Sequence, residues 1–143
     1  MEHVWSVICL NYIVDRESGN LSLIDIPDRL SFSGEVPEKR PFELTLPAPF
    51  FLVSTWRRSG KSEEATESAL VRVYGPNDEV IGDFDVIVPF TDSQTHRTYG
   101  KTETVLYQQD GLHRFEVCIR KEGDWTPVAS IPLEITHKEP ESV

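Results

Sequence analysis

The sequence predicts an all-β fold, a two-sheet antiparallel β-sandwich of immunoglobulin-like or related Greek-key type with about eight or nine strands. Apolar residues alternate with a period of two over most of the chain, which is typical of strands. Turn signals rich in Gly, Pro, Asn and Asp separate these runs, and no long stretch shows the period of a helix. The 143 residues suit a single domain, expected over 1–137, with a frayed tail at 138–143.

The expected first strand, residues 4–14, is apolar on both faces. That pattern predicts either a central strand covered on both sides or a strand packed against a partner molecule. The stretch RESGN then predicts a turn with Gly19 at its tip, and residues 21–26 return as the second strand until Pro27. We therefore interpret the dense charges of this region as turn chemistry in a hairpin and not as a reaction site.

Prolines mark the region that follows. Four of them lie between residues 37 and 49, so a helix is disfavoured and short or edge strands are expected. Residues 50–56 are dense in β-forming side chains and predict another strand. The polar stretch RRSGKSEEATES predicts a loop, with room for a short helical turn at 62–65.

The C-terminal half predicts a series of strands separated by the turn sequences GPND, QQDG and KEGD. The clearest alternation, near the end of the chain, places His113 on the inward face, and Pro132 places the last strand at a sheet edge or a bulge. The expected strands cover residues 68–74, 79–90, 102–107, 112–120 and 128–135.

The charge balance bears on partners. The formal net charge is −10 and the isoelectric point is near 4.8. Such a field repels phosphate backbones and anionic membranes, so we expect neither nucleic acid nor membrane as a partner. The N-terminal apolar run is too short to span a bilayer and lacks the basic start of a secretion signal, which predicts a cytoplasmic protein.

The two cysteines, Cys9 and Cys118, fall in apolar strand-like runs far apart in the sequence. Two such residues form no disulfide framework, and a metal site would need more ligands at closer spacing. We expect both to be small buried apolar residues, and we expect no cofactor.

No catalytic constellation emerges from the motifs. The segment SGKS, residues 59–62, resembles the end of a phosphate-binding loop, but Thr55 stands where that motif needs its first glycine. The four histidines show no ligand spacing, and no serine sits in G-x-S-x-G. Cys118 lies five positions after His113, an odd separation that puts the two side chains on opposite faces of one strand. The prediction is that the protein is not an enzyme.

Two features leave a ligand-binding alternative open. Trp125 follows the KEGD turn, where an exposed indole suits stacking on a sugar or peptide, although it equally suits a cap on the end of the sandwich. Acidic pairs occur at Asp25 and Asp28 and at Asp83 and Asp85, and carboxylates are the ligands of Ca²⁺. No continuous calcium-loop motif accompanies them, so no metal ligand is assigned.

Three patches together resemble one protein family. They are VICLNYIVDRESGNLSLIDI, ALVRVYGPNDEVIGDF and DGLHRFEVCIRKEGDWTPVASIPLEI, and they extend from about residue 7 to 135. The chain resembles a family of small uncharacterised bacterial β-sandwich proteins, a domain of unknown function. In that family the closing hairpin usually reads G-x-Y-x-F, and His113 stands at the expected tyrosine. The resemblance implies a compact sandwich and carries no functional residue to this chain.

The functional hypothesis is therefore a non-catalytic, cytoplasmic binding or assembly module that acts through protein–protein contacts, with another copy or a different protein as partner. The alternative is a sandwich that binds carbohydrate through Trp125 or binds Ca²⁺. The long loops expected at 57–67 and 91–99 also belong to this alternative. A hydrolase with a site assembled from distant loops is the least favoured interpretation.

Overall fold

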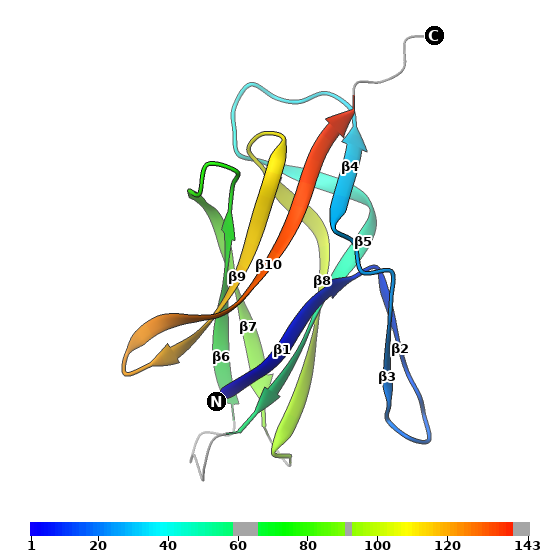
Figure 1. Ribbon diagram of the computed structural model, residues 1–143, viewed down its shortest axis with the longest axis vertical. Coiled ribbons are helices and arrows are strands. Elements are labelled where there is room, and N and C mark those ends of the chain that lie inside the picture. Colours follow the sequence, from blue (N-terminus) through cyan, green and yellow to red (C-terminus); the bar gives the residue numbers. More distant parts are fainter. Residues whose placement is uncertain (59–65, 91–92, 139–143) are drawn as a thin grey trace.

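The computed structural model describes residues 1–58, 66–90 and 93–138, and these residues contain strands and no helix (Figure 1). The all-β prediction is therefore confirmed. The suggested helical turn at 62–65 and the tail beyond residue 138 lie outside the described residues. The strands are β1 (Glu2–Cys9), β2 (Asn11–Val14), β3 (Leu21–Ile24), β4 (Arg29–Ser33), β5 (Phe42–Arg57), β6 (Thr66–Tyr74), β7 (Val80–Pro89), β8 (Thr95–Tyr107), β9 (Gly111–Lys121) and β10 (Asp124–Lys138).

The described strands form three sheets, in the orders β1-β5-β8, β4-β10-β9-β6-β7 and β2-β3. The expected arrangement of eight or nine strands in two antiparallel sheets is not confirmed, since ten strands are present in the described residues. The pairing of β4 with β10 is parallel, which corrects the expectation of purely antiparallel sheets. Parallel neighbours need a long connection, and here almost the whole domain lies between the two strands.

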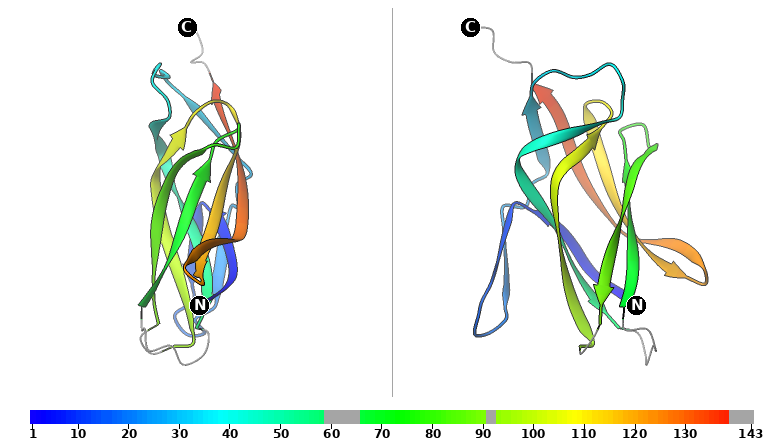
Figure 2. Two further views of the ribbon diagram at one scale, coloured as in Figure 1. Left: turned by 90° about the vertical axis from the view of Figure 1, so that its left-hand side faces the viewer. Right: turned by 180° about the vertical axis from the view of Figure 1, so that it is seen from behind.

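Inward side chains of the two larger sheets form one apolar core. Trp56 and Phe50 from β5, together with Phe90 beyond β7, are the largest fully buried side chains. Valines and isoleucines from β6, β9 and β10 fill the space opposite them. Each such side chain contributes about 1.5–3 kcal/mol relative to an exposed one. Figure 2 shows the strands around this core from the side and from behind.

The apolar run at the N-terminus is two strands rather than the single strand expected over residues 4–14. It breaks at Leu10, whose N–H donates to the carbonyls of Ile24 at 3.2 Å and Asp25 at 2.9 Å. The chain thereby leaves the sheet of β5 and enters the separate β2–β3 hairpin, which projects at the lower right of Figure 1. The charges around its tip are turn chemistry, as predicted: the Asp15 carboxylate accepts from the N–H groups of Glu17 and Ser18 at 2.9 and 2.8 Å.

This hairpin explains how the N-terminal apolar run is covered. Tyr12 packs against Phe51 at 5.1 Å and stacks on Tyr99 at 4.5 Å between ring centroids. Because Phe51 neighbours the core residue Phe50 along β5, its side chain points to the opposite, outer face of the sheet. Cys9 pairs with Phe51 and is fully buried on that face. The chain's own hairpin thus covers part of a surface for which the sequence allowed a partner molecule.

Strand β9 follows its predicted alternation. His113 is fully buried, and its Nδ1–H donates to the carbonyl of Gly111 at 3.1 Å. Cys118 lies on the opposite face of β9, beside Glu116, as the odd separation of the two residues predicted. At Pro132 the described residues give β10 no strand partner on its second side, because the pairing with β4 begins only at Glu134. The prediction of an edge position for this proline is therefore confirmed.

Candidate binding groove

A groove of about 790 Å³ lies between β7 and β8. It is lined by residues of these two strands and by three core or rim positions from other strands. The lining residues are Glu43, Val73, Asp83, Phe84, Asp85, Val86, Ile87, Pro89, His96, Arg97, Thr98, Tyr99, Gly100, Lys101, Thr102, Glu103, Thr104, Val105, Leu106 and Phe115. The volume falls within the range of about 300–1,000 Å³ that is usual for ligand sites.

The groove exists because two strands that are consecutive in the sequence do not pair. β7 ends the sheet of β6 and β9, whereas β8 ends the sheet of β1 and β5, and the described residues form no ladder between them. Each strand therefore turns one unpaired edge, with its N–H and C=O groups, toward the groove. Figure 2 brings this side of the molecule forward in the view from behind.

The floor of the groove is apolar. Val86 and Val105, from the two edges, and Phe115 of β9 are among the residues that form it. Phe84 lies on the same face of β7 as Val86, yet it remains 37 % exposed because no strand covers that edge. Beyond Asp83, Gly82 lets β7 approach β8, since a Cβ atom there would collide with Leu106 Cδ1.

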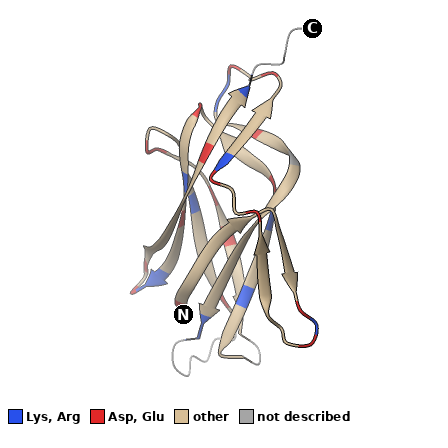
Figure 3. Cartoon of the chain, turned by 45° about the vertical axis from the view of Figure 1, so that its right-hand side comes forward, with Lys and Arg blue, Asp and Glu red and all other residues tan. Residues whose placement is uncertain are grey.

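The rim of the groove is acidic. Glu43, Asp83 and Asp85 are exposed and make no ion pair with any residue that the structure describes. The two cations on the rim already have partners. Lys101 pairs with Glu103 at 3.3 Å, and Arg97 donates to the carbonyl of Gly19 at 3.0 Å. Figure 3 shows the Lys and Arg positions spread singly over several strands.

A smaller hollow of about 400 Å³ contains Trp125, the residue that the sequence suggests as a ligand contact. Its other walls include Met1, Glu67 and Ser68. The guanidinium of Arg120 lies over the Trp125 ring at 4.8 Å, so a cation–π contact within the chain already uses one aromatic face. The role of Trp125 as a ligand contact stays a prediction.

The acidic pairs do not converge on a metal site. Across residues 1–58, 66–90 and 93–138, no three His, Cys, Asp or Glu side chains lie close enough to hold a metal ion. Asp83 and Asp85 lie on the exposed face of β7, as expected for alternating strand residues. In the same described ranges no helix is long and apolar enough to cross a bilayer.

One serine–histidine contact bears on the hydrolase reading. His3 Nε2 lies 2.7 Å from Ser6 Oγ, which shares a hydrogen bond of 2.7 Å with Ser54 Oγ. Ser54 is buried, and burial lowers the pKa of His3 below its ordinary value. None of the three lines either hollow described above. The His3 ring meets the ring of Trp56 edge-on at 5.3 Å between ring centroids.

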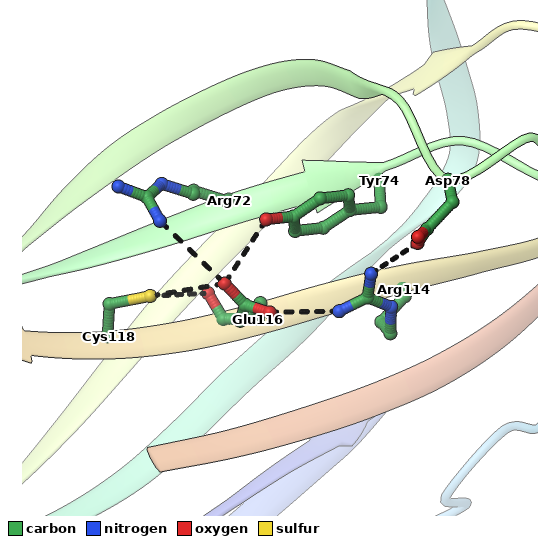
Figure 4. Close-up of polar contacts among 6 residues, drawn as sticks. All are labelled: Arg72, Tyr74, Asp78, Arg114, Glu116 and Cys118. Atoms are coloured by element: carbon green, nitrogen blue, oxygen red, sulfur yellow. Dashed lines mark hydrogen bonds and ion pairs between the residues drawn. The ribbon is translucent and has the colours of Figure 1, made fainter. Parts of the chain in front are cut away.

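A second polar cluster, centred on Glu116, was not predicted (Figure 4). Its carboxylate is 8 % exposed and accepts from Arg114 Nη1 at 2.9 Å and from Tyr74 Oη at 3.3 Å. Arg72 approaches it to 3.9 Å, and Arg114 also binds Asp78. These groups meet because β6 and β9 pair Arg72 with Glu116 and Tyr74 with Arg114, a register that the sequence does not display. The cluster is internally satisfied and ties neighbouring strands together.

Cys118 adjoins this cluster and gives a chemical prediction. Its Sγ lies 3.5 Å from Glu116 Oε1, and burial together with that carboxylate raises the pKa of the thiol to about 11. Burial also raises the pKa of Cys9. We expect neither thiol to react with Ellman's reagent in the native protein at about pH 8, because the thiolate is the nucleophile. Both thiols should react in denaturant. Rapid release of thionitrobenzoate by the native protein would contradict the buried placement of the two cysteines.

Comparison of the chain with protein-family models, with curated proteins and with solved structures finds no match. The resemblance to a bacterial family of unknown function therefore stays a prediction.

Proposed function

We propose that this protein is a non-catalytic, cytoplasmic protein-binding module that takes an extended segment of a partner protein into the groove between β7 and β8. In this proposal the two larger sheets act as an immunoglobulin-like sandwich that holds the two edges apart. The observation that carries the proposal is the pair of unpaired strand edges facing each other across an apolar floor.

A polypeptide strand is the occupant that best satisfies these edges. An added strand hydrogen-bonds through its main chain to an exposed sheet edge, and alternate side chains enter the pockets beneath it. Here one inserted strand would meet main-chain groups on both sides, from β7 and from β8. Its inward side chains would cover Phe84, which is 37 % exposed, and Val86, which is only partly buried.

The length of the groove also favours a chain over a compact ligand. The lining residues of β7 run from Asp83 to Pro89. Six residue steps of about 3.3 Å each give roughly 20 Å of strand edge. An extended segment of about six residues has the same length.

The groove variant Phe84→Asp tests the proposal. Peptides of about ten residues would be selected from a random display library on the wild-type protein, and their dissociation constants measured by fluorescence anisotropy. We expect Phe84→Asp to weaken the selected peptides at least about tenfold, because a charge replaces an apolar contact at the centre of the site.

The matched control is Val80→Asp. Val80 lies on the same strand and is 52 % exposed, but it does not line the groove. Its replacement should leave peptide binding unchanged, and thermal unfolding of both variants would verify that each is folded. Failure of any peptide to be enriched, or equal weakening by both substitutions, would refute the proposal.

The carbohydrate alternative has weaker support. It depends on Trp125, whose ring is already covered on one face by Arg120. The calcium alternative lacks a converging set of carboxylates among the described residues. Both are therefore secondary to the groove.

A further inference from the structure

We infer that the segment received by the groove is a basic, amphipathic strand in which apolar residues alternate with Lys or Arg. This inference rests on the proposed function and names the chemistry of its partner. It follows from the two different surfaces that a strand between β7 and β8 would face.

The inner surface demands apolar side chains. Successive side chains of a strand point to opposite faces, so every second residue of the inserted segment would enter the core side. There it would meet Val86 and Val105 from the flanking strands, with Phe115 beneath. A charged side chain in that position would lose its hydration without a partner.

The outer surface demands positive charge. The other residues of the partner strand, between its inward-facing ones, would point outward. Asp83 and Asp85 point to this same side, since they alternate with the inward Phe84 along β7. Neither carboxylate is engaged by an ion pair in the described residues, and Glu43 adds a third negative charge at the rim. The rim cations Arg97 and Lys101 already have partners.

The charge pattern also disfavours a second copy of this chain as the occupant. Each chain carries a net charge of −10, so two copies repel each other. If two β7 edges paired, the Asp83 and Asp85 carboxylates of one copy would approach those of the other. Like charges at directly opposed strand positions are destabilising. A basic segment of a different protein has the opposite electrostatics.

Three synthetic peptides of about nine residues test the inference on the full-length protein. All would carry Val and Phe at alternate positions, with Lys, Ser or Glu at the positions between. We expect the Lys peptide to bind at least about tenfold more tightly than the Glu peptide, with the Ser peptide intermediate. The preference should shrink as NaCl is raised from about 50 to about 300 mM, because exposed charges are screened.

Paired variants separate local recognition from general attraction to an acidic protein. Asp83→Asn with Asp85→Asn should strongly reduce the preference for the Lys peptide, with Glu43 as the remaining rim charge, and leave the affinity for the Ser peptide unchanged. Asp25→Asn with Asp28→Asn changes the net charge equally at a place that does not line the groove, and it should preserve the preference.

The possible failures are distinguishable. If the Ser peptide binds in the groove but all three peptides bind equally, the inference about charge is overturned and the proposed function survives. If no peptide binds, the proposed function fails as well. If the Lys preference is undiminished in the Asp83 and Asp85 variant, or if sedimentation shows a dimer that Phe84→Asp dissociates, the basic-strand partner is overturned.

Discussion

Replacement of Trp56 by alanine should lower the free energy of unfolding by about 3–5 kcal/mol, measured by urea denaturation. The Trp56 side chain is fully buried in the core between the two larger sheets. Its Nε1–H donates to Thr98 Oγ1 at 2.9 Å, and its ring meets His3 edge-on at 5.3 Å. The truncation therefore leaves a cavity and also removes a hydrogen bond between β5 and β8.

Two further variants divide this loss into its causes. Trp56→Phe keeps most of the apolar volume but deprives Thr98 of its donor, so we expect a smaller loss of about 1–3 kcal/mol. Trp125→Ala is the matched control, because this half-buried indole has the Arg120 guanidinium over its ring, and we expect a loss of about 1 kcal/mol or less. Equal destabilisation by Trp56→Ala and Trp125→Ala would contradict the placement of Trp56 in the core.

Acidification below about pH 6.5 should destabilise the protein through His113. Burial lowers the pKa of His113 below its ordinary value of 6.5, although the Gly111 carbonyl and the charges of Glu79 and Asp110 act in the opposite direction. The unfolded chain therefore takes up the proton at a higher pH than the folded chain. The contribution of the neutral His113 to the free energy of unfolding is complete above the pKa of this histidine in the unfolded chain. It is lost as the pH falls below that pKa, by up to about 1.4 kcal/mol per pH unit for one proton.

The measurement is urea unfolding of the wild type and of His113→Phe at about pH 7.5, 6.5 and 5.5. Phenylalanine keeps a ring beside Tyr107, where the His113 ring now lies parallel at 6.3 Å, and it cannot take up a proton. We expect the variant to lose less stability on acidification than the wild type. A residual slope is expected from His3, whose pKa burial also lowers. An unchanged slope in His113→Phe would show that this histidine does not carry the effect.

Expectations that depended on neighbouring residues in the sequence were confirmed. The inward His113 and the opposite placement of Cys118 follow from the two-residue period of a strand, which is a local property. The hairpin turn is local too, since the Asp15 carboxylate accepts from the N–H groups two and three positions later in the chain. The break at Leu10 was missed because the residues on both sides of it are apolar and β-forming.

The candidate groove was beyond the reach of sequence reasoning. From the sequence, Asp83 and Asp85 are an acidic pair within one expected strand, 79–90. Nothing in the alternation of that strand tells whether β7 pairs with β8 or diverges from it. The only local hint is Gly82, which permits the close approach near Leu106 but does not reveal the gap beyond it.

The sequence by itself therefore determined the all-β class, the turn chemistry and which side chains face inward, because these depend on residues a few positions apart. The tertiary structure alone decided which strands pair. It set the parallel β4–β10 contact, the hairpin that covers Cys9, the register that assembles the Glu116 cluster and the unpaired β7 and β8 edges. The physical reason is that a strand's pattern fixes its apolar face, whereas its hydrogen-bonding edges are alike for every sequence. Partners for those edges are chosen by packing between residues far apart in the chain.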